Sequence, residues 1–132
     1  IRYENTTYGF TFTLPHTWQG YQIIEEEWEG LLLDGSNAKE TGPKLLIRHP
    51  KWQEAEPRQD IPILVLTHKQ WQFSQNEALG IGAAPIPPRA LGQNDQYVFA
   101  LEARYNMAFL PGYEEVEEIL ENEPLESLEM KP

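Results

Sequence analysis

The sequence contains no cysteine. This absence excludes disulfide bonds, thiolate metal sites and cysteine nucleophiles. The chain also lacks an apolar run of about 18 residues, the length that a bilayer-spanning helix needs, so no membrane insertion is expected.

Basic residues are scarce as well. Ten Lys and Arg stand against 21 Asp and Glu, which gives a formal net charge of −11. Nucleic acids and anionic membrane surfaces are bound through clustered Lys and Arg, so neither is expected as a partner. Solubility is the simplest explanation of the charge; an acidic docking face for a basic partner and weak cation binding are the alternatives.

Catalytic and metal-binding motifs are missing from the sequence. The serines lie outside any Gly-x-Ser-x-Gly motif. The histidines, His16, His49 and His68, are not at metal-ligand spacings such as His-x-x-x-His, and no glycine-rich nucleotide-binding loop is present. The sequence therefore predicts a protein that is not an enzyme, with no catalytic residue, no metal ligand and no cofactor.

The length and the spread of apolar residues predict one domain over residues 1–132. Hydrophobic residues make up 40% of the chain and occur along its whole length, and no linker divides it. The sequence begins with Ile1 rather than Met. We therefore expect that a signal peptide or lipoprotein leader has been removed, and that the protein is secreted or lipid-anchored outside the cytoplasm. These features assign no oligomeric state.

Several segments have the residue pattern of strands. Phe10, Phe12 and Leu14 alternate with Thr11 and Thr13, which is typical of a half-buried strand. Further strands are predicted over residues 21–28, 31–33, 44–49, 62–67 and 96–101, the last running on to residue 104.

The most apolar of these segments, residues 62–67, is predicted to be a central strand that is buried on both faces. Pro62 is compatible only with the first position of that strand. Residues 36–42 and 51–59 are predicted to be loops. Three prolines within residues 83–88 predict an extended segment that is not a central strand.

Two helices are predicted. Thr67 is a suitable N-cap for a helix over residues 68–78. Residues 113–121 place apolar side chains on one helical face among glutamates, and residues 125–128 are expected to form one more turn. Strands followed by a helix, then strands and a helix, indicate an α+β protein with an antiparallel β-sheet flanked by helices.

The tryptophans suggest a binding surface. Trp18 and Trp52 fall in predicted turn or loop segments, where an exposed indole often marks a contact site. Together with Tyr21, Arg48 and His49 they are expected to line a groove for another protein. In the alternative interpretation, the loops fold back and the indoles cover the edges of the core.

A second candidate site lies at two strand ends. His49 follows one predicted strand and His68 follows another, so the two would lie close together if those strands pair. With Asp60 and Trp71 they would form a pocket for a small molecule or a cation. The alternatives are independent polar residues at element ends and, third, a hydrolase-like enzyme that uses His and a carboxylate.

The segment from Tyr8 to Trp18 reads YGFTFTLPHTW. It resembles the Tyr-Gly-Phe-x-hydrophobic-x-x-Pro-x-x-Trp opening of PsbP-like domains, which share a fold group with the nuclear-import factor that binds the GTPase Ran. The chain is also similar to small bacterial proteins of unknown function that are secreted or lipid-anchored. The resemblance implies an α/β/α sandwich around an antiparallel sheet, and a binding or assembly role rather than catalysis. It carries over no functional residue.

Overall fold

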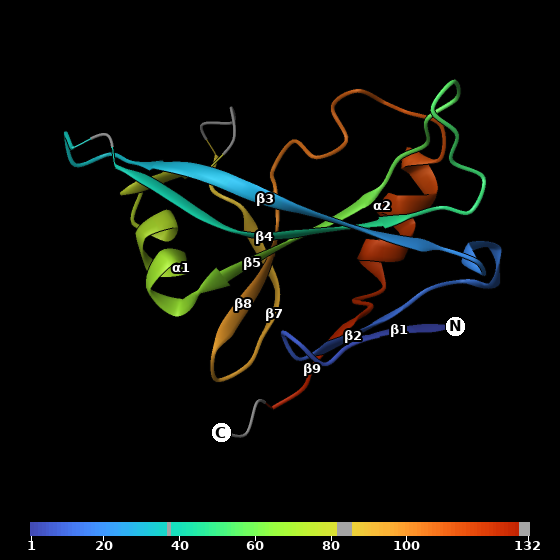
Figure 1. The fold of residues 1–132 in the computed structure, drawn as a ribbon, viewed down its shortest axis with the longest axis horizontal. Coiled ribbons are helices and arrows are strands. Elements are labelled where there is room, and N and C mark those ends of the chain that lie inside the picture. The colour runs from blue at the N-terminus through green and yellow to red at the C-terminus, as the bar shows by residue number, and fades with distance from the viewer. Residues whose placement is uncertain (37, 82–85, 130–132) are drawn as a thin grey trace.

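The computed structural model describes residues 1–36, 38–81 and 86–129, and within them the chain is an α+β protein with two antiparallel sheets and two α-helices (Figure 1). The larger sheet curls into a half-barrel; its strands, in spatial order, are β6 (Leu79–Ile81), β3 (Gln22–Leu32), β4 (Lys39–Arg48), β5 (Ile61–Thr67), β8 (Tyr97–Leu101) and β7 (Arg89–Gln93). The smaller sheet contains β1 (Arg2–Asn5), β2 (Phe10–Thr13) and β9 (Leu125–Ser127). The helices are η1 (His16–Trp18), α1 (His68–Gln75) and α2 (Tyr113–Glu121).

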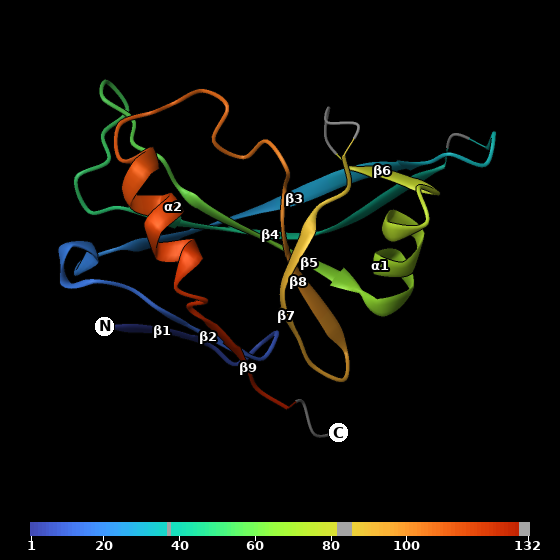
Figure 2. The same ribbon diagram turned by 180° about the vertical axis from the view of Figure 1, so that it is seen from behind.

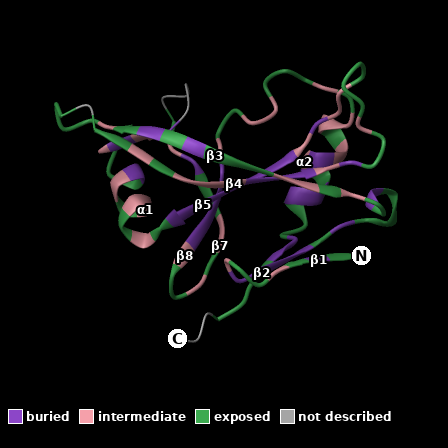
Figure 3. Ribbon diagram, viewed as in Figure 1, coloured by how far each residue is buried: buried purple, intermediate pink, exposed green. Residues whose placement is uncertain are grey.

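The core lies on both faces of β5. Ile63 and Val65 face a cluster that is covered by α2 and the small sheet, whereas Leu64 and Leu66 face a second cluster beside α1. The two helices lie at opposite ends of the large sheet (Figures 1 and 2). Buried residues follow β5 and β8 through the middle of the molecule (Figure 3). The prediction of a central strand buried on both faces is confirmed, although Ile61, not Pro62, begins it.

Helix α1 begins at the predicted N-cap. Thr67 Oγ1 accepts a hydrogen bond of 3.1 Å from the backbone N–H of Gln70, and the Thr67 N–H donates to the Gln70 side chain. The helix ends at Gln75 rather than at residue 78, because Glu77 takes a left-handed φ of 59° and Leu79 already pairs with β3.

Helix α2 has the predicted bounds and buries the predicted apolar face, with Val116, Ile119 and Leu120 in the core. Its N-cap is Gly112, whose φ of 87° is unfavourable for residues with a side chain. The extra helical turn predicted over residues 125–128 is not formed. Leu125 pairs instead with Phe12, so this segment is strand β9.

The β3–β4 hairpin is longer than predicted. Ten residue pairs run from Gln22 opposite Arg48 to Leu31 opposite Lys39, so part of the predicted 36–42 loop is strand. Gly30 does not interrupt β3. Its lack of a side chain lets the edge strand β6 pair closely with β3, since a Cβ at this position would lie 2.8 Å from the Gly80 carbonyl oxygen. Strand β8 ends at Leu101 rather than at residue 104.

Residues 83–85, half of the proline-rich segment 83–88, lie outside the described residues. Neither α1 nor α2 is long and apolar enough to cross a membrane, and no other helix among the described residues is.

Candidate functional site

The antiparallel pairing of β4 and β5 separates the predicted histidine pair. Ile47, at the end of β4, lies opposite Ile61, at the start of β5. His49 and His68 therefore lie at opposite ends of these strands, and the prediction that they would be neighbours is wrong. His68 Nε2 lies 2.8 Å from the Asn94 carbonyl oxygen, and Trp71 packs against the core cluster beside α1.

The remaining predicted site residues come together near the end of β4, and they are Trp18, Tyr21, Arg48, His49, Trp52 and Asp60. Trp18 belongs to η1, Tyr21 directly precedes β3, and Arg48 is the last residue of β4. The other three lie in the β4–β5 loop (residues 49–60). The antiparallel sheet thus assembles six of the eight candidates from segments that are separate in the sequence.

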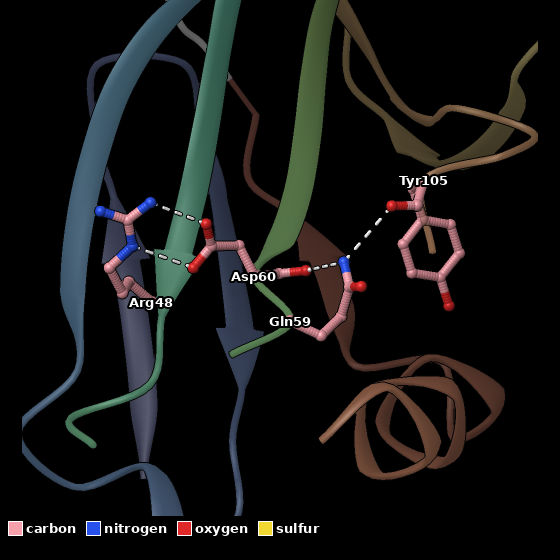
Figure 4. Close-up of polar contacts among 4 residues, drawn as sticks. All are labelled: Arg48, Gln59, Asp60 and Tyr105. Carbon is pink, nitrogen blue, oxygen red and sulfur yellow. Dashed lines mark hydrogen bonds and ion pairs between the residues drawn. The ribbon is translucent and has the colours of Figure 1, made fainter. Parts of the chain in front are cut away.

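Arg48 forms both an ion pair and a ring contact in this region. Its Nε and Nη2 atoms donate to the two carboxylate oxygens of Asp60 at 3.0 and 2.8 Å (Figure 4). The same guanidinium lies over the Trp52 ring, with Cζ 3.8 Å from the ring centroid. The hydrogen bonds to Asp60 raise the pKa of Arg48 above its ordinary value. A bidentate ion pair therefore fixes the cation on which the half-buried indole of Trp52 stacks.

Trp18 is not a surface residue. Its side chain is 1% exposed, and its indole N–H donates to Glu115 at 3.0 Å. Glu115 also accepts a hydrogen bond from Thr17, so η1 is attached to α2. Tyr21 is half-buried and packs edge-on against Tyr3. The expected exposure of Trp18 is therefore wrong, and the alternative, an indole that covers the edge of the core, is confirmed.

His49 is buried beside Trp18, with 5% of its surface exposed and the two ring centroids 4.9 Å apart. Its Nδ1 accepts a hydrogen bond of 3.0 Å from the backbone N–H of Lys51. Burial, followed by the positive charge of Arg58, lowers the pKa of His49 below 6.5. The neutral imidazole therefore carries its proton on Nε2.

Gln59 connects the β4–β5 loop to the segment between β8 and α2 (residues 102–112). Its side-chain amide donates to the carbonyl oxygens of Asp60, at 2.9 Å, and of Tyr105, at 3.4 Å (Figure 4). Its backbone N–H donates to Pro111. The two segments, together with β4 and β5, border an open hollow of about 240 Å³. It is lined by Lys44, Leu46, Gln59, Asp60, Pro62, Glu102, Arg104, Tyr105, Ala108 and Leu110.

A second and larger hollow, of about 670 Å³, lies beside the β4–β5 loop. It is lined by Pro50, Lys51, Gln53, Glu56, Pro57, Arg58, Leu110 and Pro111. The sequence does not single out Lys51, Arg58 and Gln59, because all three lie in a polar stretch whose composition predicts only a loop. The prolines that bound this stretch were the available signal, since they indicate a stiff segment rather than a mobile one.

This region offers hydrogen-bonding groups, charge and aromatic surface to a ligand or partner. The described residues contain no group of three or more acidic or histidine side chains that could hold a metal ion. His49 accepts its hydrogen bond from a backbone N–H, and no carboxylate among the described residues orients its ring by a hydrogen bond. No family model, no curated protein and no solved structure matches this chain.

Proposed function

We propose that this chain is a non-enzymatic binding domain that contacts another protein through a surface centred on Trp52. The observation that supports this proposal is the stack of Trp52 on a guanidinium that Asp60 holds in place. Trp and Arg are the residues that most often dominate the binding free energy of protein interfaces. Both are ordered before a partner arrives, so little conformational entropy is lost when it binds.

The surroundings of Trp52 suit a protein partner. The β4–β5 loop that carries it contributes polar residues to both hollows, Gln59 and Asp60 to the smaller and Lys51, Gln53 and Glu56 to the larger. Met107 and Phe109 are each 68% exposed and lie in the segment that borders both hollows. Exposed apolar side chains beside polar hollows are typical of interaction surfaces.

The PsbP-like resemblance belongs to the same proposal. The segment that carries it contributes Phe10, Phe12 and Trp18 to the core, so the resemblance concerns the fold and not the contact surface. One helix at each face of the large antiparallel sheet supports an α/β/α arrangement, with the small sheet added to the layer of α2. The resemblance also supports a binding or assembly role and a location outside the cytoplasm.

Site-specific photo-crosslinking tests the proposed contact. A photoreactive residue replaces Gln53, which is exposed beside Trp52, or Lys69, which is exposed on α1 at the far end of the sheet. We expect one defined adduct from position 53 in an extract of the native cells and none from position 69. Trp52→Ala should weaken capture by about tenfold or more. Equal adducts from both positions, or capture unchanged by Trp52→Ala, would refute the Trp52 surface.

A further inference from the structure

The side chain of Arg58 forms no hydrogen bond and no ion pair with any described residue. Its Nε atom is nevertheless buried. A buried N–H group without an acceptor is destabilising, and a partly buried cation without a counter-charge even more so. The two Nη groups of the same guanidinium are not buried, so a ligand can reach them and supply acceptors there.

The guanidinium of Arg58 is held against the backbone. It lies on Gly112, where a Cβ would be only 3.1 Å from Nη2 and 3.6 Å from Cζ. Gly112 has a φ of +87°, so its conformation and the guanidinium both favour glycine at this position. The contact fixes the cation at the wall of the larger hollow instead of leaving it free in solvent.

Nearby acidic groups do not neutralise Arg58. Asp60 forms its ion pair with Arg48, and Glu115, which keeps its negative charge, is hydrogen-bonded to Trp18 and Thr17. The positive charge of Arg58 reaches His49 and contributes to the low pKa of that buried imidazole. At His49 the effect of Arg58 exceeds the opposite effect of Glu115, and Lys51 adds to it, so the charge balance at this point is positive in a chain whose formal net charge is −11.

The walls of the larger hollow define the kind of anion. Pro50, Pro57 and Pro111 line the wall. Their rings fix the backbone φ, so the wall is stiff there, and they have no N–H, so it offers no backbone donor at these positions. Lys51 adds a second cation and Glu56 adds one carboxylate. Arg58, Lys51 and Glu56 together carry one net positive charge, which matches a ligand with one negative charge. The apolar wall lowers the local dielectric constant and so strengthens the attraction between them.

We propose that Arg58 and Lys51 form a binding site for a single carboxylate group in the larger hollow. The carboxylate accepts from the Arg58 guanidinium and lies within the field of Lys51, while the carbon skeleton behind it packs on the proline wall. A small organic acid and the chain-terminal carboxylate of a peptide share this chemistry. Carboxylate binding at this site does not require Trp52, so it can be tested separately from the proposed protein contact.

Side-chain NMR tests the site with defined probes. Sodium acetate, N-acetylleucine, N-acetylleucinamide and inorganic phosphate are titrated while the arginine Nε–H resonances are recorded. We expect both carboxylates to shift the Arg58 Nε–H resonance and to slow its exchange with water. The Arg48 Nε–H, already bound to Asp60, is the internal reference and should not move.

Matched charge changes check the assignment. Arg58→Gln should weaken carboxylate binding by about tenfold or more, and Lys51→Gln by about threefold with a reduced salt dependence. Lys69→Gln makes the same charge change on α1 and should have no effect. Lys51 is exposed, so Lys51→Gln keeps the test valid if the Arg58 variant does not fold.

The probes also separate the sources of the carboxylate. Equal affinity for acetate and N-acetylleucine supports a small organic acid, and tighter binding of N-acetylleucine supports a peptide chain end. Binding of N-acetylleucinamide as tight as that of N-acetylleucine, a preference for phosphate, or an Arg58 resonance that no carboxylate moves would overturn the proposal.

Discussion

The indole N–H of Trp28 donates a buried hydrogen bond of 2.8 Å to the carbonyl oxygen of Val65. Lys44 lies opposite Leu64 in the β4–β5 pairing, and the same register places Pro43 opposite Val65. Proline has no N–H to donate to the neighbouring strand. The indole, which lies over Gly42, therefore supplies a donor where the backbone of β4 has none.

Trp28→Phe should destabilise the fold by about 1–3 kcal/mol, because it leaves the buried Val65 carbonyl without its donor. Urea unfolding measures the change. Trp71→Phe is the matched control, since the Trp71 indole forms no hydrogen bond among the described residues and should lose less than about 1 kcal/mol. Equal losses in the two variants would contradict a special role for the Trp28 N–H.

Gly42→Ala should destabilise the protein by about 1–3 kcal/mol or more. The new Cβ would overlap the Trp28 indole and lie 2.8 Å from the Val65 carbonyl oxygen. Gly80→Ala is the control, because its Cβ would meet nothing nearer than Leu33 at 3.7 Å. Thermal unfolding of both variants decides the point; a Gly42→Ala midpoint no lower than that of Gly80→Ala would show that the indole can move aside.

The alanine variants of Trp18 and Trp52 should separate core from surface. Trp18→Ala removes a fully buried indole and should cost about 3–5 kcal/mol. Trp52→Ala removes a half-buried ring and its stack on Arg48, for which about 1 kcal/mol is expected. Chemical denaturation measures both losses. A loss of several kcal/mol for Trp52→Ala would make Trp52 a core residue and remove it from the proposed contact surface.

The buried His49 should make stability depend on pH. Its pKa is lowered in the folded state, first by burial, so between that value and 6.5 the unfolded chain binds a proton that the folded protein does not. The contribution of His49 to the free energy of unfolding is therefore fully present above pH 6.5, and it decreases as the pH falls below 6.5. His49→Asn retains an acceptor for the Lys51 N–H without a titratable ring.

Unfolding free energies at pH 5 and pH 7.5 are then compared for the wild type and His49→Asn. The wild type should lose more stability than the variant between these values, because the other titratable groups are common to both proteins. An equal loss would mean that His49 is protonated as easily in the folded state as in the unfolded chain.

Where a pattern is local, it was sufficient to predict the structure. Thr67 caps α1 and the apolar face of residues 113–121 forms α2, because capping and helical periodicity involve neighbours within a few residues. The apolar run ending at Thr67 forms the central strand β5, because a continuous apolar run is also a local signal. The residue types of the six site residues near the end of β4 indicate a binding surface, but the sequence predicts their proximity only in part.

The sequence by itself thus determined the α+β class, both helices, the central strand and an acidic, cysteine-free surface. Tertiary structure alone decided the antiparallel pairing that separates His49 from His68, the burial of Trp18 under Glu115, and the unpaired guanidinium of Arg58 beside Gly112. Each of these depends on contacts between segments distant in the chain. Strand direction and loop packing set such contacts, and neither leaves a periodic signal in the local sequence.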